Sequence, residues 1–305
     1  MKNTPLISII TPTYNRAHTL VECIESVLNQ CYPHFEWWII DDGSADDTAT
    51  IINQYEDERI KYYPLGKHTG SLSYLRNLGV SKAKGTYISF IDSDDCWLPQ
   101  KLTEQIHAIQ QHSTAKWAFC DVIEFNQTAM LRDGIYQRLN RTNGVYPNLF
   151  TDLIHGQLII FPSSVLIHRT AFAEVGQFDE SLPLSDQAFL IRLAKQCTAY
   201  FSNAKLVKIR KHDQNMSHQP KIQESGHLEI IQQLEAAYQS RLVSSDFYQQ
   251  RKAQLLFGLG KVYQHSRQYQ QALNTYQQAQ KYSSFPSKLW LKIALHYCWT
   301  CIHPK

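Results

Sequence analysis

The chain has 305 residues, of which 43% are hydrophobic, and its formal net charge is +3. This apolar share allows a packed core and excludes general disorder, and the length suits a large α/β domain with an appendage. The small charge, without a long block of lysine and arginine, disfavours nucleic acid as a partner.

Several features of the sequence predict where the chain works. No run of about 18 apolar residues predicts a membrane-spanning helix. The N-terminal residues lead into a strand without a signal-peptide cleavage site. The seven cysteines are scattered and odd in number, as expected in a reducing compartment. We therefore expect a cytoplasmic protein.

Buried strands alternate with amphipathic helices over the first 110 residues. Apolar runs predict strands at residues 6–10, 36–40, 59–63 and 86–91. Apolar residues three and four positions apart predict helices at residues 20–31, 51–55, 71–84 and 99–109. Ser44, with Asp47 three residues later, fits the N-cap of the second helix. The alternation predicts an α/β fold with a doubly wound, mostly parallel, Rossmann-like sheet.

The pattern is less regular beyond residue 113. Strands are predicted at residues 117–125, 158–168 and 206–210, and a helix at residues 186–195. The stretch 126–156 is polar and irregular, which is typical of loops that surround a substrate.

The sequence becomes purely helical from about Pro220. One set of positions resembles a tetratricopeptide repeat, a helix-turn-helix unit: Leu256, Leu259, Gly260, Tyr263, Ala272, Tyr276 and Ala279. An ordinary helical hairpin is the alternative. Because one and a half repeats cannot form a stable solenoid, we expect this segment to pack on the remaining chain or on a second copy.

The last residues offer two more candidates. Lys288 and Lys292 share a predicted helix with Trp290, which could contact an anionic membrane surface or pack on the preceding helices. Cys298 and Cys301, flanked by histidines, could hold a metal or could belong to a partly buried helix end.

Polar clusters follow three of the predicted strands, at residues 11–16, 41–42 and 92–95. In open parallel sheets, ligands bind outside the carboxyl ends of the strands. A single aspartate there would usually be a cap or turn residue, whereas three clusters favour a binding site. No Walker loop and no Gly-x-Gly-x-x-Gly follows the first strand, which disfavours kinases and dinucleotide oxidoreductases.

The third cluster holds Asp92, Asp94 and Asp95 at one strand end. Their mutual repulsion is costly unless a cation or protons neutralise them. Oxygen ligands of this kind suit Mg²⁺ or Mn²⁺, which in turn bind phosphate oxygens. A solvated acidic turn is the alternative.

Several motifs together resemble glycosyltransferase family 2. They are Ile7–Arg16, Ile40–Ser44, Ile91–Asp95, Arg76-Asn77 with Gly79, Val175–Glu180, Asp186 with Arg192–Ala194, and His212 with Asn215 and Ser217. The resemblance covers roughly residues 5–218, and the order and spacing of the motifs make it specific. It implies a GT-A fold and an inverting transfer of sugar from a nucleotide-diphosphate donor, with a UDP-sugar favoured. The implied acceptor is a glycan or lipid-linked hydroxyl in cell-surface polysaccharide or lipid-linked glycan synthesis.

The resemblance also divides the chain. We expect a nucleotide-binding half at residues 1–105, an acceptor half at 106–218 and a helical tail at 219–305. The tail could bring the enzyme to the inner face of the membrane as a peripheral protein, or contact another protein.

The resemblance assigns roles to particular residues. The donor-binding set is Pro12, Thr13 and Tyr14 around the base and ribose, Asp42 on the base, Arg76 near the donor, and Asp92 at the ribose or diphosphate. Asp94 is expected to bind Mn²⁺ or Mg²⁺, with Asp95 as a helper. His212 could be a further metal ligand, a donor to phosphate or a surface residue.

Asp186 is the expected catalytic base, and its alternative role is a helix N-cap. Two positions depart from the family pattern. Ser185 stands where the family usually has glutamate, and His68 where it often has asparagine. Ser185 motivates a second hypothesis, a catalytically degenerate transferase-like binding module that uses the helical tail. A nucleotidyltransferase is disfavoured, because no glycine-rich basic loop follows the first strand.

Overall fold

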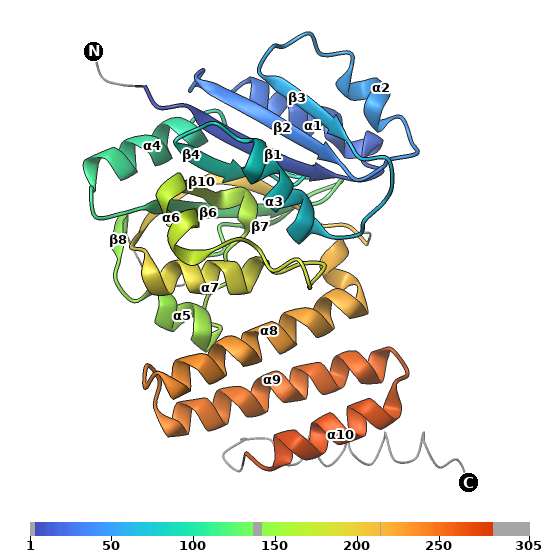
Figure 1. Cartoon of the computed structure of the whole chain (residues 1–305), viewed down its shortest axis with the longest axis vertical. Helices are drawn as coiled ribbons and strands as arrows, with labels where there is room; N and C mark the ends of the chain where they lie inside the picture. Colours follow the sequence, from blue (N-terminus) through green and yellow to red (C-terminus); the bar gives the residue numbers. More distant parts are fainter. Residues whose placement is uncertain (1–3, 137–141, 214, 283–305) are drawn as a thin grey trace. The chain divides into compact units, whose positions relative to one another are not determined.

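The structure is a computed structural model that describes residues 4–136, 142–213 and 215–282 (Figure 1). The chain divides into two compact units, residues 1–153 with 158–212, and residues 154–157 with 213–305. Apart from residues 154–157, the second unit begins at Asp213, whereas the tail was expected to begin at residue 219. The site described below lies in the first unit.

Four parallel strands form the N-terminal part of the sheet in the order β3-β2-β1-β4. They are β1 (Ile7–Thr13), β2 (Phe35–Asp41), β3 (Ile60–Pro64) and β4 (Tyr87–Phe90). Every residue of β1 and β4 is buried, which is why these strands read as continuous apolar runs. The helices that follow the strands are α1 (Ala17–Leu28), α2 (Thr48–Ile52) and α3 (Leu72–Lys82).

The sheet continues beyond β4 in the order β9-β6-β10-β5, with β7 beside β6 and β8 beside β10. These strands are β5 (Cys96–Trp97), β6 (Trp117–Phe125), β7 (Met130–Asp133), β8 (Gly144–Tyr146), β9 (Val165–His168) and β10 (Ala199–Arg210). β6 and β10 are parallel, whereas β9 is antiparallel to both β4 and β6. The α/β fold with a largely parallel central sheet is confirmed.

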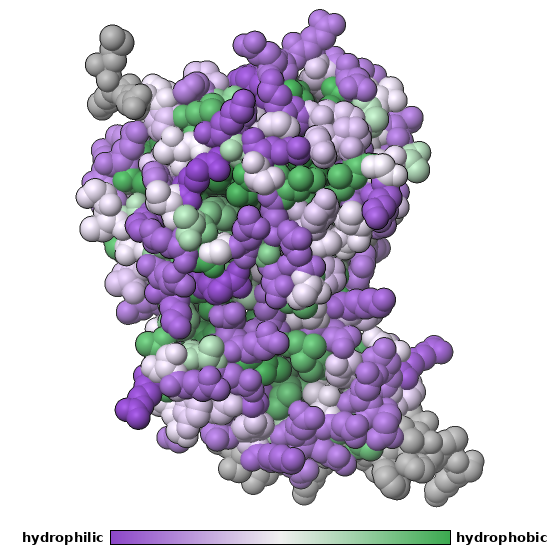
Figure 2. Space-filling model, in the orientation of Figure 1, coloured by the Kyte–Doolittle hydropathy of each residue, from purple (hydrophilic) through white to green (hydrophobic). Residues whose placement is uncertain are grey.

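Helices and short turns complete this unit. They are α4 (Lys101–Gln111), α5 (Leu149–His155), the 3₁₀ turn η2 (Pro162–Ser164), α6 (Arg169–Val175) and α7 (Asp186–Gln196). Hydrophilic residues cover much of the face seen in Figure 2, and apolar residues show in smaller areas between them.

Some predicted elements were wrong. The predicted N-cap Ser44 is not the cap, because its hydroxyl donates to Asp41 Oδ1 at 2.6 Å, and the helix begins after Asp47. Only the last four residues of the predicted strand 158–168 form β9, because Pro162 begins a 3₁₀ turn. The stretch 126–156, expected to be loops, contains β7, β8 and the whole of α5.

The second unit contains α8 (Pro220–Gln239), α9 (Ser245–His265) and α10 (Tyr269–Gln280), after the 3₁₀ turn η3 (Met216–His218). The expected helical tail is confirmed, and α9 and α10 cover most of the predicted repeat. The predicted helix around Trp290 and the Cys298–Cys301 pair lie outside the described residues. Within residues 4–136, 142–213 and 215–282, no helix has the length and apolar composition that a membrane span requires.

Candidate functional site

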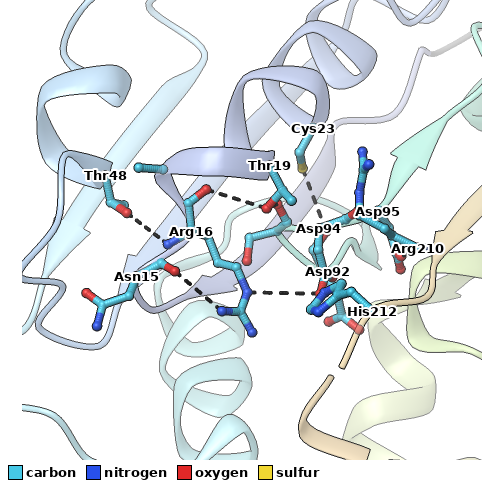
Figure 3. A network of polar contacts seen from close by, with 12 residues as sticks. Asn15, Arg16, Thr19, Cys23, Thr48, Asp92, Asp94, Asp95, Arg210 and His212 are labelled. Carbon is cyan, nitrogen blue, oxygen red and sulfur yellow. Dashed lines mark hydrogen bonds and ion pairs between the residues drawn. The ribbon is translucent and has the colours of Figure 1, made fainter. Parts of the chain in front are cut away.

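The ends of three neighbouring strands bring the predicted clusters to one edge of the sheet. Thr13 in β1 is in register with Asp41 in β2, and Ile10 with Phe90 at the end of β4. The turn after β4 is held from several sides. Thr19 of α1 donates to the Ser93 carbonyl, and Cys23 contacts the Asp92 carbonyl (Figure 3). The three polar clusters therefore lie side by side at the edge formed by the carboxyl ends of β1, β2 and β4, where the sequence predicted them.

Asp94 lies between a histidine and an arginine from distant parts of the chain (Figure 3). Its Oδ2 atom is 2.9 Å from His212 Nε2 and 4.0 Å from Arg16 Nε. Asp94 and His212 side chains are 14% and 19% exposed. Both therefore reach the surface of the site, where a ligand could contact them.

Asp95, the next residue, points the other way. Its Oδ2 accepts a hydrogen bond from Ser163 Oγ at 2.5 Å, and its Oδ1 accepts one from the Arg210 backbone N–H at 3.0 Å. Burial, with Asp94 and Asp92 nearby, raises the pKa of this carboxyl well above its usual range. Asp95 therefore ties the turn to β10 and η2 and is not aimed at the surface, in contrast to the helper role expected for it.

Arg76 connects two of the predicted site aspartates. Its side chain is fully buried, its Nη2 donates to Asp92 Oδ1 at 2.7 Å, and its Nη1 donates to Asp186 Oδ1. Asp92 remains one-third exposed. Because Arg76 has no exposed surface, it does not face a donor directly, which differs from the role expected from the sequence.

Asp186 is the first residue of α7, and Ser185 is its N-cap. Asp186 is buried, at 9% exposure. Burial raises the pKa of its carboxyl to about 6, Arg76 opposes this, and Asp92 adds to it. A carboxyl that titrates near neutral pH suits a general base.

Ser185 is fully buried and serves the packing around α7. Its Oγ lies 3.1 Å from Ser73 Oγ and accepts a hydrogen bond from the Asp179 backbone N–H at 3.0 Å. Ser185 thus joins α3 and Asp179 to the start of α7, where Asp186 follows.

The predicted base-binding residues form a second group. Pro12 and Thr13 are buried at the end of β1, whereas Tyr14 is exposed. Asp42 is buried and accepts hydrogen bonds from Thr69 N at 2.8 Å, Thr69 Oγ1 at 2.7 Å and Gly70 N at 2.9 Å. The structure therefore brings Tyr14 and Asp42 together with the segment after β3.

A family comparison decides the identity. The family model described as Glycosyl transferase family 2 matches residues 8–175, more than half of the chain. The chain belongs to glycosyltransferase family 2.

Curated relatives agree with this assignment. An uncharacterized glycosyltransferase of Rickettsia typhi is 31% identical over 216 residues, covering 68% of this chain and 65% of the relative. The UDP-Glc:alpha-D-GlcNAc-diphosphoundecaprenol beta-1,3-glucosyltransferase WfaP of Escherichia coli is 42% identical over 105 residues, covering 34% of this chain and 41% of the relative. The chain spans less than two thirds of the length of either relative.

A solved structure matches the fold. The crystal structure of S. aureus TarS 1–349 in complex with UDP-GlcNAc has a TM-score of 0.69 at 19% identity, and the match covers 97% of this chain and 87% of that chain. At this identity the likeness shows the fold alone. The expected GT-A fold of this family 2 glycosyltransferase is confirmed.

The residues of this family 2 protein fit a divalent cation through a small donor set. Within the described ranges, no group of three or more His, Cys, Asp or Glu side chains is arranged to hold a metal. Asp94 and His212 nevertheless offer an oxygen and a nitrogen 2.9 Å apart at the surface. Mg²⁺ sites usually combine one or two carboxylates with water and substrate phosphates, so Asp94, with His212 beside it, is the place where such a cation could be held.

Sequence reasoning missed two residues of the site. In the sequence, Arg16 stood out only as the last residue of a motif. In the structure, the preceding Asn15 has a left-handed backbone, with φ of 51°, and the Arg16 side chain lies 4.0 Å from Asp94. Ser163 gave no signal, although its hydroxyl binds Asp95 and accepts from the Asp92 backbone N–H. Its role depends on where η2 packs in the fold, which local sequence does not reveal.

Proposed function

We propose that the protein is an inverting glycosyltransferase that moves a sugar from a nucleotide diphosphate, preferably UDP, to an acceptor hydroxyl. The observation that carries the proposal is the buried carboxyl of Asp186, with a pKa of about 6, linked through Arg76 to Asp92 after the end of β4. A base near neutral pH beside a site for phosphate-bound cations is what a single displacement requires.

The donor would lie against the ends of β1, β2 and β4. Tyr14 would stack on the base, with Pro12 and Thr13 beneath the ribose and Asp42 accepting a hydrogen bond from the base. The partly exposed Asp92 would contact the ribose or diphosphate. Asp94 and His212 would hold Mn²⁺ or Mg²⁺, which when bound neutralises charge on the departing diphosphate.

Asp186 would take the proton from the acceptor hydroxyl. The acceptor oxygen then bonds to the anomeric carbon as the bond from that carbon to the diphosphate oxygen breaks. The products are the glycosylated acceptor, with inverted anomeric configuration, and a nucleoside diphosphate. One displacement without a covalent intermediate needs one base, and Asp186 supplies it.

Two expected roles change in this proposal. Asp95 supports the turn through Ser163 and Arg210 and is not a direct metal ligand. Arg76 acts on carboxylates and does not touch the donor. The proposed acceptor is a glycan or lipid-linked glycan of the cell surface. Its support is the undecaprenyl-linked acceptor that the name of WfaP gives for that relative.

A thermal-shift screen of nucleotide sugars, with and without Mn²⁺, tests the function. A donor that binds the folded protein raises its melting temperature, and the increase should be larger with Mn²⁺. Release of nucleoside diphosphate in the presence of the stabilising sugar then measures turnover. The alternative, a degenerate binding module, predicts no turnover with any donor. The buried, supporting role of Ser185 does not favour that alternative.

A further inference from the structure

We propose that Arg76 is a positioning residue whose buried guanidinium holds both the catalytic base Asp186 and the donor-side Asp92. The inference deepens the proposed function and rests on it for the role of Asp186. It replaces the expected contact between Arg76 and the donor with an indirect action through two carboxylates.

The environment of the Arg76 guanidinium leaves it few alternatives. It is fully buried, donates to Asp186 Oδ1 with one amino group and to Asp92 Oδ1 with the other. Its central carbon lies 5.7 Å from the centre of the Phe178 ring and 6.0 Å from that of Phe90. A planar guanidinium can serve two carboxylates at once, whereas the ammonium of lysine is a point charge.

The backbone that carries Arg76 is fixed by its neighbour. Asn77 donates to the Phe178 carbonyl at 2.9 Å and accepts from the Phe178 N–H at 3.0 Å, and it also donates to Glu180 at 2.8 Å. This part of α3 is therefore bound to the segment that leads to α7. Arg76 has a defined origin from which to reach Asp186.

The hydrogen bond from Arg76 fixes which oxygen of Asp186 can accept a proton from the acceptor. Arg76 occupies Oδ1, and within the described residues Oδ2 has no hydrogen bond, so Oδ2 is left for an acceptor hydroxyl. The charged groups that act on Asp186 are Arg76, which favours the ionised form, and Asp92, which disfavours it. Arg76 thus sets both the direction and the charge of the base.

The shared guanidinium also makes the two sides of the site interdependent. A donor that shifts Asp92 changes one of the two contacts of Arg76 and therefore the hold on Asp186. Loss of Arg76 leaves the buried carboxyl of Asp186 and the half-buried carboxyl of Asp92 without their common partner, which is costly.

Arg76→Gln and Arg76→Lys test the proposal, with Arg169→Gln as the matched control. Arg169 is a structural arginine whose hydrogen bonds to described residues are to the backbone carbonyls of Gly85 and Ala83. Release of UDP from a UDP-sugar is measured between about pH 5 and pH 9, and UDP affinity is measured by calorimetry with Mn²⁺. We expect both Arg76 variants to lose about tenfold or more in kcat at neutral pH, because Asp186 loses the fixed orientation that the two-armed guanidinium gives it.

The pH profile separates positioning from a purely structural role. Without Arg76 the pKa of Asp186 rises, so in Arg76→Gln the acid limb of kcat should move to higher pH and the rate should recover in alkali. UDP affinity should fall by a smaller factor than kcat, because Asp92 loses one partner while the contacts at Tyr14 and Asp42 remain. The proposal is overturned if kcat in Arg76→Gln depends on pH as in wild type and differs only by a constant factor. A wild-type kcat in Arg76→Lys also overturns it.

A readout without turnover distinguishes this proposal from the proposed function. If the wild type releases no UDP, the proposed function fails, and the melting temperature still tests Arg76. The melting temperature should fall more steeply from about pH 5 to pH 8 in the Arg76 variants than in Arg169→Gln. Adding Asp186→Asn should reduce the extra slope, with Asp92 accounting for what remains; if the slope is unchanged, Arg76 does not act on Asp186. If Arg76→Gln does not fold, Arg76→Lys decides by the same comparison.

Discussion

The imidazole of His68 stacks on the ring of Tyr14, with 3.8 Å between the ring centroids. The same imidazole places Nδ1 2.8 Å from Asp42 Oδ2. The Asp42 carboxylate accepts three hydrogen bonds, from Thr69 and Gly70, and His68 lies close to its Oδ2 atom while contacting the Asp42 carbonyl oxygen at 3.3 Å. His68 thus covers both the Tyr14 ring and the Asp42 carboxylate. We expect a nucleobase that stacks on Tyr14 and bonds to Asp42 to displace His68.

His68→Ala should therefore bind UDP more tightly than wild type. The gain should be about fivefold, the equivalent of roughly 1 kcal/mol for the hydrogen bond between His68 and the Asp42 carbonyl that no longer has to be broken. Calorimetry with UDP and Mn²⁺ measures it. Lys67→Ala, an exposed change on the same segment, is the control and should leave the affinity unchanged. Weaker binding in His68→Ala would show that His68 supports the base instead of occupying its place.

Asp94→Asn and Asp95→Asn should separate the two neighbouring aspartates. Asp94 is partly exposed beside His212, so its amide variant should lose the increase in UDP affinity that Mn²⁺ produces. Asp95 is buried between Ser163 and the Arg210 N–H, so its variant should keep that increase. Asp95→Asn should instead lower the free energy of unfolding by about 1–3 kcal/mol, the cost of a buried group left without a partner. A normal Mn²⁺ response in Asp94→Asn contradicts the proposed ligand.

Asp186→Asn should abolish transfer and leave UDP affinity largely unchanged. Loss of a general base typically lowers the rate by about 10²–10⁴-fold. Single-turnover measurements with the donor already bound are the appropriate readout. Transfer at the wild-type rate would remove Asp186 from its assigned role.

The same variant should change how stability depends on pH. The folded protein keeps the Asp186 proton up to about pH 6, whereas the unfolded chain releases it near its ordinary value of 3.8. Wild-type stability should therefore fall as pH rises through this window, by roughly 3 kcal/mol in total. Asp186→Asn lacks this fall, so its melting temperature should match wild type near pH 4 and exceed it above pH 6. A constant difference at every pH would contradict the raised pKa.

The sequence predicted the elements of the site better than their partners. Apolar runs located the parallel strands, and β6 has the predicted bounds Trp117–Phe125. The clusters after β1, β2 and β4 also meet at one edge, because strand ends share an edge in a parallel sheet. Local pattern could not distinguish Asp94 from Asp95, since their difference comes from Ser163, a residue far along the chain. The pairing of Arg76 with Asp186 is equally non-local.

The packing of the helical unit makes a last prediction. A Cβ on Gly260 of α9 would lie 2.3 Å from the Tyr276 ring of α10, and Tyr276 is fully buried. Gly260→Ala should therefore separate the two helices and destabilise this unit by about 1–3 kcal/mol, a typical cost of overpacking.

Gly226→Ala is the matched control on α8, where an added Cβ meets nothing within 4 Å. Alanine has a helix propensity about 1 kcal/mol better than glycine, so this variant should be stabilised. Urea unfolding followed by circular dichroism measures both. If Gly260→Ala is as stable as Gly226→Ala, the close approach of α9 and α10 at Tyr276 is wrong. The resemblance to a tetratricopeptide repeat then loses its main contact, because that motif places a small residue where its two helices meet.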